Sequence, residues 1–237
     1  MTKPSSESQN SGVVSTIQKS PAPLRRQVLD ELRQSIITGR LEPGARLVER
    51  ELVGMMGVSR TVIREALRQL ESEGLIAIIP NKGPVVRKLT LDEARDLYSI
   101  RAVLEGLAAR LFVENGGDAQ LEKLEHALED TAEAYWGGQT TRILDTKNRF
   151  YDVLFEGAGS ETLSSMIELL HMRIWRWRAL GLSHPKRSSE RSKESIDGLL
   201  AVLEAIRERD ADLAEKTMRD EARRAAAEVM RLLVDGA

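Results

Sequence analysis

The most constraining feature of this sequence is the order of apolar patterns and turn residues over positions 21–90. Four apolar residues recur at every fourth position, the spacing of one helix face: Leu24, Val28, Leu32 and Ile36. This helix is expected to stop at Gly39, and a short helix over 49–56 follows it. Ser59 is a favourable N-cap for a third helix, which Gly74 closes. The pattern therefore predicts three helices in the first folded part of the chain.

Two short β-like runs come next, over 75–79 and 85–89. The residues between them, Pro-Asn-Lys-Gly-Pro at 80–84, are typical of a turn. Gly57 permits a sharp turn between the second and third helices. The order of helix, helix, tight turn, helix and hairpin predicts a winged helix-turn-helix over residues 21–90.

The rest of the chain has helical periodicity and no strand pattern. Thr90 and Glu93 form a capping-box pattern for its first helix. Glycine-rich or polar breaks divide this part into six expected helices: 91–115, 118–137, 140–157, 160–181, 188–208 and 210–234. The predicted fold class is mainly α, with a winged helix-turn-helix followed by an all-α bundle of about six helices. We expect a disordered, Ser-rich tail over 1–20 and a helical domain over 91–237.

The charge of the chain is distributed unevenly between the two expected domains. Residues 21–90 carry 12 lysines and arginines against 8 aspartates and glutamates, whereas residues 91–237 carry 21 against 28. A basic module joined to an acidic one indicates a polyanionic partner for the first module only. The sequence has no cysteine, no signal-peptide pattern and no apolar run long enough to cross a membrane. We therefore expect a cytoplasmic protein without a membrane partner.

The third expected helix has two different faces. Apolar residues line one face, which we expect to be buried: Ile63, Ala66, Leu67 and Leu70. Arg60, Arg64 and Arg68 follow at spacings of four on another face, with Thr61 beside the first of them. Arginine pairs with guanine edges or phosphates in the major groove, and Lys82 at the hairpin tip can reach the backbone. An arginine stripe can equally be a solvated helix face, but the helix-turn-helix order and the basic hairpin favour DNA.

Several ordered motifs in this region also occur together in a known family: Gly39-Arg40-Leu41-Glu42-Pro43-Gly44, Glu49-Arg50-Glu51-Leu52, Gly57-Val58-Ser59-Arg60-Thr61, Arg64-Glu65-Ala66-Leu67 and Glu73-Gly74-Leu75. They resemble the winged helix-turn-helix of the GntR superfamily of transcriptional regulators. The resemblance implies DNA contacts from these residues: Arg50, Arg60, Thr61, Arg64 and the wing-tip residues Asn81, Lys82 and Gly83. Arg68 joins them on its spacing alone.

The second part of the chain carries looser matches: Tyr98 with Arg101, Leu104 and Glu105; Phe150 with Leu154; Ala205-Ile206 with Asp210, Ala211 and Ala214; and Met218-Arg219. These resemble the FCD domain, the all-helical effector domain of the FadR-type branch of that superfamily. The resemblance implies a helical domain that binds a small-molecule effector and forms the dimer. In many FCD domains an acidic residue and three histidines hold a metal ion in the effector cavity.

This sequence departs from the metal pattern at every position that can be aligned. Lys147 stands at the acidic residue, Tyr151 and Leu199 at the first and second histidines, and Glu221 at the third. Zinc and similar ions prefer imidazole and carboxylate ligands. An ammonium and a leucine are not such ligands, so we expect no metal and no other cofactor.

The same cavity retains groups that suit an anion. Arg101, Lys147, Tyr151 and Arg173 supply cationic and hydroxyl donors, and such donors fix the carboxylate of a small acid. Glu221 is the fifth candidate at this site. The alternative is that Lys147 and Arg173 face solvent or pair with acids such as Glu105 and Glu221.

Taken together, the sequence predicts a homodimeric, sequence-specific transcriptional regulator. Its expected partners are a palindromic double-stranded DNA operator and a small, acidic effector, and it is not expected to be an enzyme. A di-iron bundle would need paired Glu-x-x-His motifs, and a serine hydrolase a nucleophile elbow; the sequence has neither. An architectural DNA-binding protein would be more basic and would not need the second domain.

Overall fold

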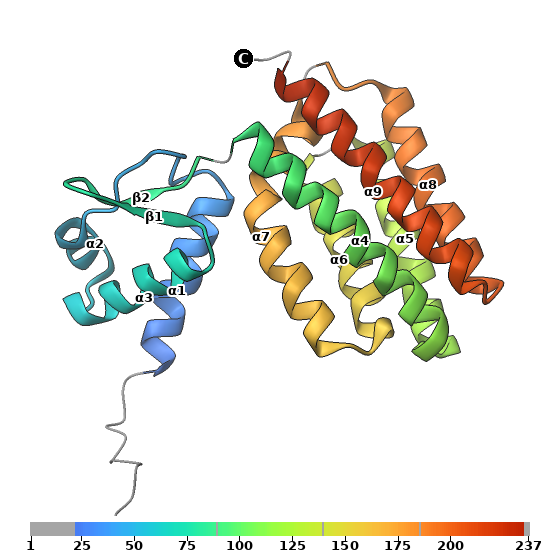
Figure 1. The fold of residues 1–237 in the computed structure, drawn as a ribbon, viewed down its shortest axis with the longest axis horizontal. Coiled ribbons are helices and arrows are strands. Elements are labelled where there is room, and N and C mark those ends of the chain that lie inside the picture. Colours follow the sequence, from blue (N-terminus) through green and yellow to red (C-terminus); the bar gives the residue numbers. More distant parts are fainter. Residues whose placement is uncertain (1–21, 89, 139, 185, 235–237) are drawn as a thin grey trace, which may run out of the picture.

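The computed structural model describes residues 22–88, 90–138, 140–184 and 186–234. The elements along these residues are α1 (Ala22–Ile37), α2 (Glu49–Met56), α3 (Arg60–Ser72), β1 (Ile76–Ile79), β2 (Gly83–Val86), α4 (Leu91–Asn115), α5 (Asp118–Gly137), α6 (Thr140–Ala158), α7 (Glu161–Ser183), α8 (Ser189–Arg207) and α9 (Ala211–Val234). Figure 1 shows two bodies, with α1–α3 and the two strands on one side and α4–α9 on the other. The expected tail over 1–20 lies outside the described residues.

The first body is the predicted winged helix-turn-helix. Residues from α1, α2, α3 and both strands form its apolar core, with Ile63 and Leu70 of α3 at its centre. The two antiparallel strands pair Ile76 with Val86 and Ile79 with Gly83. An isolated bridge between Arg46 and Val85 attaches the segment before α2 to the sheet. This body therefore has its own core and its own small sheet.

Local signals explain where the helices of this body begin and end. Gly57 ends α2 in the left-handed region with a φ of 64°, and Ser59 starts α3 by accepting a hydrogen bond from the Val62 N–H at 3.4 Å. The second strand differs from its prediction over 85–89, because it begins at Gly83. The Lys82 N–H donates to the Ile79 carbonyl at 3.0 Å, which closes the turn so early that pairing resumes at the next residue.

The second body is an all-helical domain whose six helices lie within a few residues of their predicted bounds. Thr90 and Glu93 form the expected capping box at the start of α4. The main core is built around Phe112, Phe150 and Leu154. Figure 1 shows α4 and α9 side by side, with α8 next to α9. Helix α4 approaches α9 so closely that a Cβ on Gly106 would lie 3.0 Å from the Glu215 carbonyl oxygen.

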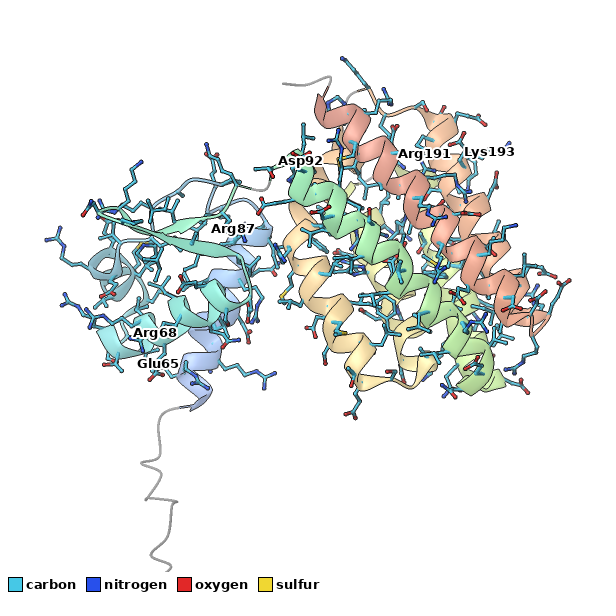
Figure 2. The ribbon with its side chains drawn as sticks, in the orientation of Figure 1. Glu65, Arg68, Arg87, Asp92, Arg191 and Lys193 are labelled. Carbon is cyan, nitrogen blue, oxygen red and sulfur yellow. The ribbon has the colours of Figure 1, made fainter. Side chains whose placement is uncertain are left out.

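One helix of the second body also contacts the first. Met172 of α7 packs against the core of the winged helix-turn-helix, and Arg173 lies against Gly74. Arg87, just after β2, forms an ion pair with Glu93 in the first turn of α4. Figure 2 shows Arg87 beside the segment that joins the two bodies. The bodies are thus connected by the chain and by the side of α7.

Within the described ranges, no helix is both long and apolar enough to cross a membrane.

Candidate DNA interface and ligand cavity

The exposed face of α3 carries the residues that the sequence singled out. Arg60, Thr61, Arg64 and Arg68 are all exposed, while the opposite face of the helix is buried in the core. Figure 2 labels Arg68 and its neighbour Glu65 on this helix, at the side of the body away from the helical domain. The arrangement places three guanidinium groups and a hydroxyl on a surface that can face a nucleic acid.

A carboxylate that the sequence reading did not consider holds two of these arginines. Glu49, at the first turn of α2, accepts hydrogen bonds from Arg64 Nε at 2.9 and 3.0 Å. Arg60 Nε lies 3.9 Å from the same carboxylate. The pairs are solvent-exposed, so they are weak and can be exchanged for phosphate or base contacts. Glu49 therefore holds the Arg60 and Arg64 guanidiniums close together on the surface, where a phosphate or a base edge can replace it.

The remaining DNA candidates lie on two neighbouring elements. Arg50 is exposed on α2. Asn81 and Lys82 are exposed at the wing tip, and Gly83 is half-buried where β2 begins. Asn81 has a φ of 63°, a left-handed conformation that asparagine tolerates better than most residues. The wing thus presents a basic side chain on a tight, well-defined turn.

The helical domain encloses a small cavity with a strongly basic lining. Its volume is about 40 Å³, room for about three water molecules. All the helices from α4 to α9, together with the segment between α7 and α8, contribute to the lining. Five basic side chains line it: Arg101, Lys147, Arg178, Arg187 and Arg191. Along the described part of the chain, no aspartate or glutamate belongs to that lining. Figure 2 labels Arg191 near the start of α8.

A buried acid lies behind one end of the cavity. Glu105 accepts a hydrogen bond from Arg101 Nε at 2.7 Å and lies 2.7 Å from His171 Nε2. Burial alone would raise the pKa of Glu105, but Arg101 and His171 lower it to about 2. Burial lowers the pKa of His171 to about 4 despite this hydrogen bond, so the imidazole is neutral at pH 7. Arg101 Nη2 also donates to the Tyr151 hydroxyl at 2.9 Å.

A second buried acid lies behind the other end. Lys147 Nζ donates to Ser195 Oγ at 2.9 Å, and Ser195 in turn donates to Glu221 at 3.0 Å. Arg191 Nη2 lies 3.7 Å from the same carboxylate. Burial would raise the pKa of Tyr135, but the nearby Lys147 and the hydrogen bond to Ser195 lower it. At this end of the cavity, Ser195 therefore links the Lys147 ammonium to the Glu221 carboxylate through two hydrogen bonds.

Arg178 contacts the first network through the ring of Tyr151. Its side chain is buried, and its Nη1 atom has no hydrogen-bond partner in the structure as described. It stacks over the ring of Tyr151 with its Cζ 5.5 Å from the ring centroid. Burial, together with the positive charge of Arg101, lowers the pKa of Arg178. An anion in the cavity would give this guanidinium the partner that it lacks.

Comparison with known families decides what these two bodies are. The model of the bacterial regulatory proteins of the gntR family matches residues 24–86, and the FCD domain model matches residues 96–224. The chain belongs to the GntR family. Its N-terminal body is the family's DNA-binding domain and its helical body is an FCD domain, so this GntR regulator is a transcriptional regulator and not an enzyme.

Relatives of this GntR regulator extend over most of its length. The HTH-type transcriptional regulator McbR of Escherichia coli is 30% identical over 192 residues, which are 80% of this chain and 85% of McbR. The HTH-type transcriptional regulator YdhC of Bacillus subtilis is 28% identical over 197 residues, covering 83% and 86% of the two chains. The solved structure of E. coli McbR/YncC matches with a TM-score of 0.73 at 26% identity, over 88% of this chain and 97% of that one.

Three of the five predicted cavity residues do not line the cavity of this GntR regulator: Tyr151 and Glu221 contact lining residues from behind it, and Arg173 lies elsewhere. Arg173 does not line the cavity; its Nε would lie 3.2 Å from a Cβ on Gly74, at the contact between the domains. Residues 173 and 178 are five positions apart, about 140° around a helix, so only Arg178 faces inward. Leu199 lies in the apolar core, whereas Ser195, one turn earlier, contacts Lys147 and Glu221.

The cavity residues of this regulator are a poor set of metal ligands. Lys147 brings an ammonium to the centre of the site, and burial with the charge of Glu105 raises the pKa of Tyr151 above its ordinary value. Glu221 is the single aligned residue that coordinates readily, and it is engaged by Ser195 and Arg191. Over the described residues, no three His, Cys, Asp or Glu side chains lie close enough to hold an ion. The absence of a metal cofactor stays a prediction.

Proposed function

We propose that this GntR regulator binds a palindromic operator as a homodimer, and that a small anionic metabolite in the FCD cavity changes its affinity for that operator. The observation that carries the proposal is the cavity lining, which has five basic side chains and, within the described chain, no acidic one. Buried positive charge without a counter-ion is costly. An anionic effector supplies the missing counter-ion, and its carboxylate or phosphate oxygens accept the free N–H donors.

The experiment is a titration of the purified, full-length regulator with small organic and inorganic anions. Calorimetry or thermal shift measures binding, and gel shift on an operator selected from random DNA measures the consequence. An anion that binds stoichiometrically and changes operator affinity supports the proposal. Cationic or neutral metabolites that bind in its place, with no response to any anion, would contradict it.

DNA recognition is assigned to α3 and the wing. Arg60 and Arg64 contact bases or phosphates in the major groove, Arg68 follows one turn further along, and Lys82 reaches the flanking backbone. Replacing Arg60 or Arg64 with alanine should weaken operator binding by about 1–3 kcal/mol. Arg149→Ala is a matched control, because Arg149 is an exposed arginine on α6 in the other domain. Operator affinity that neither substitution changes would refute the assignment of α3.

Glu49 gives this assignment a test of opposite sign. Its carboxylate competes with phosphate for Arg64 and adds negative charge next to the DNA surface. Glu49→Gln keeps the size of the side chain and removes the charge. We expect tighter operator binding in Glu49→Gln, and weaker binding would mean that Glu49 positions Arg64 for recognition.

The dimer is assigned to an exposed apolar stripe on α4. Ile100, Val103 and Leu107 are 51%, 48% and 36% exposed, and their spacing places them on one face of the helix. A second copy of this chain would cover the stripe around a two-fold axis and hold two winged helices at two half-sites. Val103→Asp should produce monomers in sedimentation experiments, whereas Leu200→Asp, at a similarly exposed leucine of α8, should not. Dimers that persist in Val103→Asp would place the interface elsewhere.

Coupling between the domains is assigned to α7 and to the segment around Thr90. On α7, His171 and Arg178 belong to the buried cluster, while Met172 and Arg173 touch the DNA-binding domain. A ligand that draws Arg178 inward would therefore also move the side of α7 that supports the other domain. Met172→Ala should leave ligand affinity nearly unchanged and weaken the response of operator binding to ligand. A full response in this variant would exclude α7 as the connection.

The effector site is further proposed to work without a metal, and the protein to act in the cytoplasm, where its operator would be. The donor set supports the first statement, because Lys147 places a positive charge where a metal would need a ligand. Elemental analysis of purified protein tests it. A stoichiometric transition metal that survives dialysis, and whose removal abolishes the ligand response, would refute the metal-free site.

A further inference from the structure

Four of the five basic residues of the cavity form two pairs, and both members of each pair lie close to one tyrosine ring. Arg101 and Arg178 each place their Cζ 5.5 Å from the ring centroid of Tyr151. Lys147 Nζ and Arg187 Cζ lie 5.9 and 6.0 Å from the ring centroid of Tyr135. The members of each pair are therefore close enough to repel one another in a buried setting.

The buried acids neutralise only part of this charge. Glu105 is engaged by Arg101 and His171 from behind the cavity. Glu221 is shared among Ser195, Arg191 and Arg224. In the described structure, neither Arg178 nor Lys147 forms an ion pair with a carboxylate. Arg178 in the first pair and Lys147 in the second thus have no carboxylate partner among the described residues.

We propose that the effector is a compact dianion that places one negative charge between Arg101 and Arg178 and the other between Lys147 and Arg187. This inference rests on the proposed function, because it specifies the ligand of the same cavity. A monoanion would satisfy one pair and leave the other repelling. Short dicarboxylates and phosphate monoesters share the required chemistry.

The shape of the cavity agrees with a short ligand. Its volume of about 40 Å³ is far below that needed for a long acyl chain or a nucleotide, so a ligand bound here must be short. The Tyr98 hydroxyl, which also lines it, is buried without a hydrogen-bond partner in the described structure. It donates to the anionic group held by Arg101, whose Cζ lies 5.6 Å from the centroid of its ring.

The test compares probes that differ in charge and little in shape. Calorimetry at pH 8 measures the Kd of the full-length regulator for succinate and its monoamide, and for methyl phosphate and dimethyl phosphate. In at least one of these pairs the dianion should bind about 10- to 100-fold more tightly than the monoanion, the size of one charge-assisted hydrogen-bonded contact. Which pair shows the preference distinguishes a dicarboxylate from a phosphate ligand.

Two variants separate a charge effect from a folding effect. Arg178→Gln and Lys147→Gln each remove one member of a pair, and each should bring the dianion-to-monoanion affinity ratio close to one while binding of the monoanion remains. A purely structural defect would weaken both probes equally. Arg149→Gln, an exposed arginine on the same helix as Lys147, should keep the wild-type ratio.

The outcomes distinguish this inference from the function on which it rests. Equal affinities for monoanion and dianion in both probe pairs would overturn the dianion inference and leave an anionic effector in place. A ratio that neither Arg178→Gln nor Lys147→Gln changes would also overturn it. Failure of all four probes to bind at millimolar concentration would overturn both this inference and the anionic effector.

Discussion

Replacing Arg178 by methionine should make the ligand-free regulator more stable, although it removes a buried and well-packed side chain. Arg101 and Arg178 each have their Cζ 5.5 Å from the Tyr151 centroid, so these two atoms are at most about 11 Å apart. At an effective dielectric constant of about 20, their repulsion at that distance is about 1.5 kcal/mol and rises as they approach. Desolvation of the unpaired guanidinium adds to this penalty.

Two contributions oppose the gain. The stacking of Arg178 over Tyr151 and Trp175 is worth about 0.5–2 kcal/mol. The attraction between Arg178 and Glu105 also stabilises the wild-type protein, although that carboxylate is mainly engaged by Arg101. Methionine retains most of the apolar contacts of the arginine stem. The expected net change is an increase of about 1–3 kcal/mol in the free energy of unfolding.

Urea unfolding of metabolite-free protein, prepared by denaturation and refolding, measures this change, with Arg149→Met as the exposed control. The same variant should gain less of the added stability that a bound dianion gives to the wild-type protein by mass action. A loss of more than about 1 kcal/mol at an unchanged m-value would refute the reasoning, because Arg178 would then be a net structural contributor and not a charge held ready for a ligand.

Three further outcomes are expected from urea unfolding. The folded-state pKa of His171 is about 4, below its ordinary 6.5, so the unfolded chain takes up the proton first as the pH is lowered. The free energy of unfolding should therefore fall by up to about 3 kcal/mol from pH 6.5 to pH 4, and His171→Gln should flatten this pH dependence. Ile63→Ala should lower the stability of the DNA-binding domain by about 2–5 kcal/mol, because Ile63 is fully buried. Gly106→Ala should destabilise the α4–α9 contact by about 1–3 kcal/mol, since the new Cβ would lie 2.5 Å from Arg219 Cγ and 3.0 Å from the Glu215 carbonyl. An unchanged urea midpoint in Ile63→Ala or in Gly106→Ala would contradict the prediction for that variant.

The DNA-binding domain was largely predictable because its signals are local. The cap at Ser59, the left-handed glycine at position 57 and the apolar spacing of α1 and α3 act within a few residues of where they stand. The second strand was displaced because its start depends on which residue closes the turn, and both Lys82 and Gly83 are compatible with the same sequence pattern. Glu49 was missed because its contact with Arg64 crosses 15 positions between two helices.

The cavity was predictable only in part. Arg101 and Lys147 line it and Tyr151 contacts Arg101, but these residues were singled out through the family resemblance and not through their spacing. Arg178 did leave a signal, because it continues the buried stripe of α7 four positions after Ile174. A charged residue on an apolar stripe indicates a buried charge, and Arg173 lies off that stripe. Ser195 was missed because its contacts with Lys147 and Glu221 join three different helices and leave no local pattern.

The proposed anion binding also gives a reason for the buried positive groups without carboxylate partners in the interior of this domain. Glu105 and Glu221 lie behind the cavity and hold Arg101 and Arg191 in place. They leave Arg178 and Lys147 without a carboxylate partner. A protein carboxylate paired with either residue would supply the counter-ion that the proposed effector supplies. The free energy that a ligand can contribute to a conformational change is limited by its difference in affinity between two states. In the proposed function, an anion that neutralises this repulsive cavity makes that difference large.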